Sequence, residues 1–277
     1  MSLNSVNTNF GAMVALQNLN KTNTDLQTTQ NRINTGLKVA SAKDNGSAFA
    51  IAQGQRAEIS SLNAVSESLS RNQSVVDVAL SAGESISDML SQLKEKALSA
   101  SDSTLNTASR DALNEDFKAI RDQIAKTVSN ASFNGINLLD GSKTEVAALA
   151  NATGGTLTVS AQDLTVGGTN SAISLSAGAD IATLTKASDL ITSIDDSIAS
   201  VSASLAKLGT ASKSLSNHAT FIGKLQDSLE AGVGNIVDAD LAKESAKLQA
   251  LQTKQQLGVQ ALSIANQSTS TVLSLFR

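Results

Sequence analysis

The sequence predicts a mainly α-helical protein, a long helical rod or coiled-coil bundle with a small β-hairpin region. Three observations support this fold class. The chain of 277 residues contains no Pro, the residue that most often interrupts a long helix. Along three long stretches, apolar residues recur at alternating intervals of three and four, which is typical of helices packed lengthwise. One further stretch carries Gly-containing turns and short alternating runs, which favour β-hairpins.

The composition leaves little room for catalytic chemistry. The chain has no Cys and a single His, which removes thiol nucleophiles, thiolate metal sites and most imidazole arrangements. Aromatic residues make up 2% of the chain and charged residues 17%, against about a quarter charged in typical domains. We therefore expect a protein that is not an enzyme, holds no cofactor or metal, and packs through aliphatic and small side chains.

Charge and hydropathy argue against two classes of partner. The net charge is −4, and the 21 Lys and Arg are scattered among 25 acidic residues, so no basic run is available to neutralise nucleic acid. The N-terminus has no positive charge before Lys21 and no apolar core of a signal peptide. The uncharged stretch 255–276 is interrupted by polar residues, so we expect no membrane insertion.

The first expected element is an amphipathic helix over residues 1–33, which a break at Thr35 and Gly36 separates from the next helix. Burying its few apolar side chains does not offset the entropy lost on ordering the segment. We therefore expect both terminal segments to be disordered in the isolated chain and to become helical when many chains pack together. The apolar residues that define this first seam are Leu3, Val6, Phe10, Leu19, Leu26 and Ile33.

A long helix is expected next, with its strictest apolar seam over residues 62–100. Only Asn72 and Gly83 interrupt that seam. Two interpretations of such interruptions stay open: they allow packed helices to slide slightly, or they fix the register, as a buried Asn does in coiled coils. A shorter amphipathic helix over 105–131 follows. Seam members include Leu62, Leu69, Val76 and Leu90.

Between residues 133 and 183 the pattern changes to one or two β-hairpins. Turn signals include Asn134-Gly135 and Gly154-Gly155, which flank short runs of alternating apolar and polar residues. Helical spacing resumes over 187–233 and, more weakly, over 237–276, with a second break expected at Gly232 and Gly234. The seam members in these two stretches include Ile198, Leu205, Leu241, Leu248, Leu251, Leu262, Val272 and Phe276.

Four local motifs resemble those of bacterial flagellins. The stretch NTGLKVASAKDNGSAFAIAQG at 34–54 is similar to the family's conserved loop and helix start, and SNASFNGINLLDG at 129–141 is similar to its F-N-G turn. Near the C-terminus, IVDADLAKES at 236–245 and VQALSIANQSTSTVLSLFR at 259–277 resemble the family's closing motifs. The conserved halves cover residues 1–142 and about 184–277, so the chain resembles a short, alphaproteobacterial-type flagellin with core domains and no outer variable domains.

The resemblance implies a structural subunit that is exported unfolded through the type III apparatus and polymerises into the extracellular flagellar filament for swimming motility. It implies that residues 1–36 and 234–277 form the inner core domain, and that 37–233 form a rod domain with its β-hairpin tip at about 133–183. The implied partners are itself and paralogous flagellins, the filament cap and hook-filament junction proteins, and an export chaperone. The alternative is that the chain is itself a hook-filament junction protein or another secreted rod-like protein of related design.

The predicted functional residues are therefore assembly surfaces, made of the seam residues named above. A second set follows from the resemblance, because many flagellins are O-glycosylated on the outer surface where the β region would lie. The alternative, that small polar residues only keep this surface hydrated, stays open. The candidate acceptors are Thr153, Thr156, Thr158, Thr165, Thr169 and Ser171.

Three other features have simple interpretations. His218 has no second His with which to share a metal, so we expect an ordinary surface or interface residue. Asp238 and Asp240 precede an apolar helical run and are expected to cap it. Where receptor-activating flagellins carry an Arg and a Leu, this chain has Gln92 and Lys96, which argues against recognition by the vertebrate innate receptor.

Overall fold

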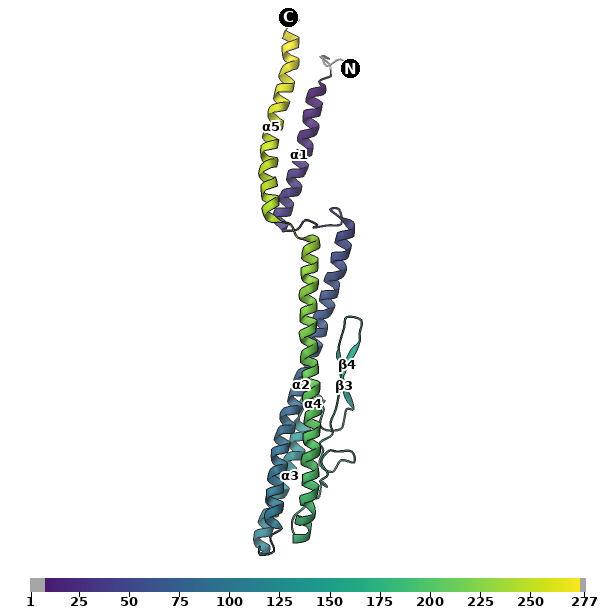
Figure 1. Ribbon diagram of the computed structural model, residues 1–277, viewed down its shortest axis with the longest axis vertical. Helices are drawn as coiled ribbons and strands as arrows, with labels where there is room; N and C mark the ends of the chain where they lie inside the picture. The colour runs from purple at the N-terminus through teal and green to yellow at the C-terminus, as the bar shows by residue number, and fades with distance from the viewer. Residues whose placement is uncertain (1–7, 275–277) are drawn as a thin grey trace. The chain divides into compact units, whose positions relative to one another are not determined.

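The computed structural model describes residues 8–274, with side chains up to residue 267. Within this range the fold is mainly helical, with two small antiparallel hairpins, as the sequence predicts (Figure 1). The chain divides into two compact units, a terminal unit made of residues up to 57 and from 228 onward, and a central unit of residues 58–227. The elements in chain order are α1 (Phe10–Thr35), α2 (Gly46–Ala100), α3 (Thr107–Asn130), β1 (Ser132–Phe133), β2 (Ile136–Asn137), β3 (Glu145–Leu149), β4 (Thr156–Ser160), α4 (Leu184–Val237) and α5 (Leu241–Ser274).

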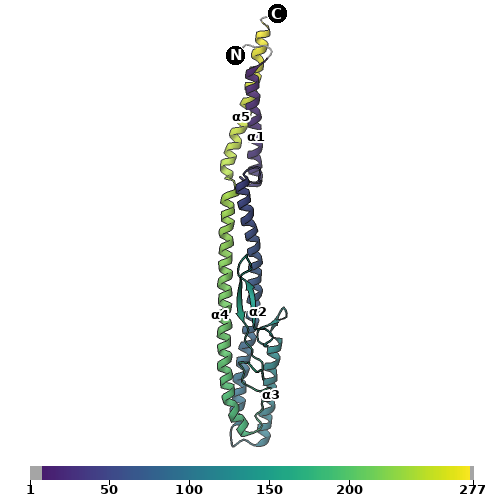
Figure 2. The same cartoon turned by 90° about the vertical axis from the view of Figure 1, so that its right-hand side faces the viewer.

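The central unit has an aliphatic core between long helices. Its parts of α2 and α4 run side by side in both views, with α3 packed along them (Figures 1 and 2). On α4 the fully buried apolar residues recur every seventh position from Ala187 to Ile222, so the helices pack in the heptad manner of coiled coils. The buried seam of α2 is the predicted one: Leu62, Val65, Leu69, Val76, Ala79, Gly83, Ile86, Leu90, Leu93, Ala97 and Ala100.

Polar residues in the seams of the central unit pair across the helices. Gln73 of α2 donates from Nε2 to the hydroxyl of Ser212 on α4 at 2.5 Å. Gln226 of α4 likewise donates from Nε2 to Asn63 Oδ1 at 2.8 Å. Asn72 differs, because its amide bonds to the Ser68 carbonyl of its own helix. Contacts between specific side chains favour register control over free sliding.

Gly83 interrupts the predicted seam because another side chain occupies the space beside it. A Cβ at this position would lie 2.6 Å from Leu205 Cδ2, well inside the distance that real atoms allow. Gly83 therefore forms a hole in α2 that receives the Leu205 side chain of α4. A specific hole for a specific side chain again opposes sliding of the two helices.

The two hairpins form where the sequence predicts turns. In β1–β2, Asn134 and Gly135 have φ of 50° and 76°, the left-handed conformation that a two-residue hairpin turn requires. In β3–β4, Glu145 pairs with Ser160 at one end and Leu149 with Thr156 at the other.

The β3–β4 hairpin is held by two helices. Leu149 donates its backbone N–H to Ser68 Oγ at 3.0 Å. His218 of α4 donates from Nε2 to the Ala150 carbonyl at 2.7 Å. The chain's one His therefore fastens the hairpin to α4, consistent with the interface role expected from the sequence.

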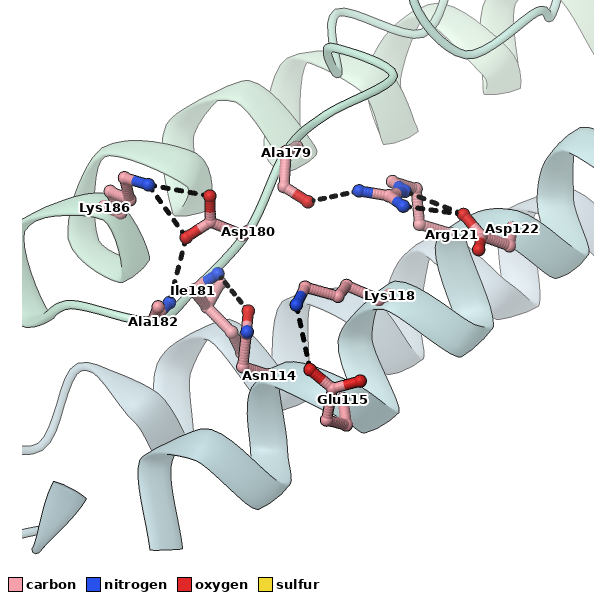
Figure 3. Close-up of polar contacts among 10 residues, drawn as sticks. All are labelled: Asn114, Glu115, Lys118, Arg121, Asp122, Ala179, Asp180, Ile181, Ala182 and Lys186. Atoms are coloured by element: carbon pink, nitrogen blue, oxygen red, sulfur yellow. Dashed lines mark hydrogen bonds and ion pairs between the residues drawn. The ribbon is translucent and has the colours of Figure 1, made fainter. Parts of the chain in front are cut away.

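The loop before α4 is held against α3 by polar contacts (Figure 3). The buried Asn114 accepts the backbone N–H of Ile181 at 2.8 Å, and Arg121 donates to the Ala179 carbonyl at 2.7 Å. Asp180 pairs with Lys186 at 2.7 Å, and the hydrogen bond from Lys186 lowers the pKa of the Asp180 carboxyl. These contacts hold a loop that has no regular hydrogen-bonded ladder of its own.

In the terminal unit, α1 and α5 lie antiparallel and the two connectors that lead to them are joined. Lys38 donates its backbone N–H to the Val237 carbonyl at 2.6 Å, and Ala239 donates to the Gly36 carbonyl at 2.8 Å. Gly36 ends α1 with φ of 71°, the left-handed conformation common at helix C-termini. Residues 10–35 and 241–274 are helical in the single chain, whereas the sequence led us to expect helices at the two ends only after assembly.

The break expected at Gly232 and Gly234 is wrong, because α4 continues through both glycines and ends at Val237. Gly in a helix costs only about 1 kcal/mol, which the packing of neighbouring turns can outweigh. The cap expected at Asp240 is present: its Oδ1 accepts the backbone N–H groups of Ala242 and Lys243.

Two glycines test the packing of the central unit. Gly83→Ala should lower the free energy of unfolding by about 1–3 kcal/mol, because the new methyl group displaces Leu205. Gly209→Ala, in α4 with open space around its Cβ position, should instead raise it by about 1 kcal/mol. Urea unfolding of the isolated subunit, followed by circular dichroism at a helix-sensitive wavelength, measures both. Equal effects of the two substitutions would contradict the fit between Gly83 and Leu205.

Candidate assembly surfaces

The interface between α1 and α5 is unusually polar. Among the described side chains of these two helices, only four residues are buried. In α1 they are Thr22 and Thr29, and in α5 they are Glu244 and Leu251. Leu251 is the one apolar residue of the four, so the paired helices do not enclose an aliphatic core of the kind found in the central unit.

Large apolar side chains of α1 and α5 are exposed instead. Met13 is 60% exposed and Ile264 is 68% exposed. The two helices carry more than half of the exposed large hydrophobic residues among the described positions. They are Phe10, Met13, Val14, Leu16, Leu241, Leu257, Val259 and Ile264.

The predicted seam residues fall into two groups. In the central unit, Leu62, Leu69, Val76 and Leu90 are buried within the subunit, while Ile198 and Leu205 are half-buried on α4. In the terminal helices, Leu251 is buried, Phe10 and Leu241 are exposed, and Leu19, Leu26, Ile33, Leu248 and Leu262 are half-buried. Leu3, Val6 and Phe276 lie outside the described residues, and Val272 lies where side chains are not described.

Sequence reasoning missed several of the exposed apolar residues. Val14, Leu257, Val259 and Ile264 lie off the predicted three-four seam, yet they are exposed by half or more. The sequence did contain a signal for them, because these apolar residues lie outside the predicted contact seam of their helices. A helix that is apolar on a face its partner does not cover needs another neighbour.

The candidate acceptor hydroxyls differ in how accessible they are. Thr153, Thr156, Thr158 and Thr169 are exposed. Thr165 is half-buried and donates its hydroxyl to Asp163 Oδ1 at 2.7 Å. Ser171 is half-buried, and its Oγ accepts the backbone N–H of Ile173 at 3.0 Å.

Within residues 8–274, the described side chains form no group of three or more His, Asp and Glu suited to holding a metal ion. In the same range, no helix combines the length and apolarity that crossing a membrane requires. Gln92 is exposed, and Lys96 pairs with Asp116 at 2.9 Å, a bond that raises the pKa of the Lys96 ammonium. Among the described residues, the exposed apolar side chains of α1 and α5 are therefore the candidate assembly surface.

A closed helical core joined to terminal helices with uncovered apolar side chains defines a structural subunit that its neighbours complete. Family models for the bacterial flagellin N-terminal and C-terminal helical regions match residues 6–144 and 191–276. The flagellins FljM and FljK of Caulobacter vibrioides are each 58% identical, covering all of this chain and all of each relative. A flagellin of Brucella melitensis is 38% identical and covers 99% of both chains.

The chain therefore belongs to the bacterial flagellin family, whose members are structural subunits of the flagellar filament. It is a short flagellin of the alphaproteobacterial type. Among solved structures, a Vibrio parahaemolyticus protein described as flagellar hook-associated is similar in fold, with a TM-score of 0.54 at 16% identity over 70% of this chain and 100% of the other. That likeness concerns the fold alone, whereas the full-length relatives are flagellins, so the alternative of a junction protein is not favoured.

Proposed function

We propose that this chain polymerises into the flagellar filament through its terminal helices, and that its role is structural rather than catalytic. One observation carries the proposal: the described side chains of α1 and α5 include a single buried apolar residue, yet these two helices carry more than half of the exposed large hydrophobic residues among the described positions. Covering that surface with neighbouring copies would gain roughly 25 cal/mol for each square ångström removed from water. Polymerisation is then the step that finishes the apolar core of the terminal unit.

The domain organisation we propose follows from this division. Residues 1–36 and 234–277 form the inner core domain around the filament channel, and residues 37–233 form the rod domain with the hairpin tip at about 133–183. The pairing of α1 with α5 supports the first part, because it joins the two ends of the chain in one element. The absence of Cys suits a subunit that assembles outside the cell without disulfides.

The proposed partners extend from self-association. FljM and FljK belong to one organism and both match this chain over its full length, so copolymers with paralogous flagellins are a natural extension. We further propose secretion through the type III export apparatus with a chaperone, and assembly beneath a filament cap and above hook-filament junction proteins. Exposed apolar terminal helices are the kind of segment that a chaperone must cover before export.

Seeded polymerisation tests the proposed function. Purified subunit added to short filament seeds should grow long filaments, visible by negative-stain electron microscopy. Leu257→Ser combined with Ile264→Ser should abolish growth, because both side chains are largely exposed in the single chain and would face neighbours in the polymer.

The matched control replaces an exposed polar residue of the same helix, Gln256→Ser, and should grow as the reference does. Unfolding of the central unit should be unchanged in both variants. Reference subunits that stay monomeric with intact ends, or normal growth of the Leu257 and Ile264 variant, would overturn the proposal.

We also propose that the hairpin region carries O-linked sugars. The preferred acceptors are Thr153, Thr156, Thr158 and Thr169, and the less favoured ones are Thr165 and Ser171. The first four residues are exposed, whereas Thr165 and Ser171 are half-buried; the hydroxyls of Thr153 and Thr165 each donate a hydrogen bond, to Asn151 and Asp163. Native filament protein should then exceed the sequence mass, with the added mass on peptides that contain the four exposed Thr. Intact native protein at the unmodified sequence mass would refute the modification.

A further inference from the structure

The α1–α5 pair is held by polar side chains that meet at matched positions along the two helices. Gln255 of α5 donates from Nε2 to Asn23 Oδ1 of α1 at 2.7 Å. Further along the pair, Arg32 of α1 donates from Nη1 to Glu244 Oε1 of α5 at 3.1 Å. The two contacts are separated by comparable lengths of each helix, so both are satisfied by one antiparallel alignment.

The low exposure of the Arg32–Glu244 pair makes its loss more costly in free energy than the loss of an ion pair on the surface. The side chains of Arg32 and Glu244 are 27% and 11% exposed, which places the ion pair in the interface. Arg32 Nε and Glu244 Oε2 are buried without a further hydrogen-bond partner, and so is the hydroxyl of Thr29 one turn earlier on α1. Losing the ion pair would leave the nearly buried Glu244 carboxylate without its partner, which is costly.

Apolar packing contributes less to the alignment of α1 and α5, although Leu19 packs against Gly258. Leu251 is the single buried apolar residue among the described side chains of the two helices. The hydrophobic effect is also non-directional, so aliphatic contacts specify register less strictly than polar pairs do. A polar pair in a helical interface is the best-attested device for specifying register.

We infer that the polar pairs Asn23–Gln255 and Arg32–Glu244 are positioning residues that fix the register of α1 against α5, and so align the exposed apolar side chains for the neighbouring copy. In this pair, the polar contacts that would set the register lie between α1 and α5, and the apolar side chains that would bind a neighbouring copy lie on the exposed faces. A shift of one heptad would displace Leu257 and Ile264 relative to Met13 and Leu16 by about 10 Å at 1.5 Å per residue. The composite surface offered to a second copy would no longer match. This inference rests on the proposed polymerisation.

The geometry supplies reporters for register in a chain that has no Cys of its own. A Cβ built on Gly258 lies 3.9 Å from Leu19 Cβ, within the about 3.5–4.5 Å typical of disulfides. Leu19→Cys with Gly258→Cys therefore reports the register seen here. Leu19→Cys with Ala265→Cys reports a shift of one heptad, because Ala265 also faces α1, where its Cβ lies 3.8 Å from a Cβ built on Gly11.

The test removes both polar pairs together, with Asn23, Arg32, Gln255 and Glu244 all replaced by Leu. Each reporter pair is placed in the reference chain and in this four-Leu variant, and disulfide formation is scored in the isolated subunit by mass spectrometry. We expect the reference to form the Leu19–Gly258 bridge and not the Leu19–Ala265 bridge. The four-Leu variant should form both bridges and should lose seeded growth.

Rescue then separates register from stability. Oxidising the Leu19–Gly258 reporter within the four-Leu variant locks the register and should restore seeded growth, and reduction should remove it again. A four-Leu variant that forms only the Leu19–Gly258 bridge and grows normally overturns the inference. Formation of neither bridge also overturns it, since the polar pairs would then be needed for association itself. Failure of the reference to polymerise defeats the proposed function instead, while the bridges still report register.

Discussion

The incomplete burial of the terminal helices is the constraint on which the rest of the structure depends. α1 and α5 are joined by hydrogen bonds such as that between Gln255 and Asn23 and by one ion pair, and they leave Met13, Leu257 and Ile264 exposed. A single subunit cannot bury those side chains with the residues it has. A neighbouring copy of the same chain can bury them. The same contacts would therefore drive polymerisation and stabilise α1 and α5.

The central unit follows the opposite rule, because it encloses an aliphatic core of its own. Heptad-spaced Ala, Ile, Val and Leu of α4 meet the strict seam of α2, and α3 packs along these helices (Figures 1 and 2). Gly83 admits Leu205, and the pairs Gln73–Ser212 and Gln226–Asn63 fix the alignment of α2 and α4. The same device, a polar pair within a helical interface, thus recurs in both units, although only in the terminal unit does it carry most of the specificity.

Much of this could be predicted from local patterns. The three-four spacing located α2 and α4, the Asn134-Gly135 signal located a hairpin, and Asp240 was recognisable as a cap. The end of α4 was misplaced because a Gly marks a helix boundary only when packing does not hold the helix, and here packing does. Periodicity also cannot tell whether an apolar face meets its own chain or another one. The pairing of Asn23 with Gln255 joins residues at opposite ends of the sequence, and no local rule identifies such partners.

Hydrogen–deuterium exchange, measured on the isolated subunit and on the filament, tests the central claim most directly. The account predicts that amides of α1 and α5 exchange much faster than those of the central unit in the isolated subunit, because few apolar contacts resist their opening. In the filament their protection should rise to the level of the central helices. Equal protection of all five helices in the isolated subunit, with no gain on polymerisation, would contradict it.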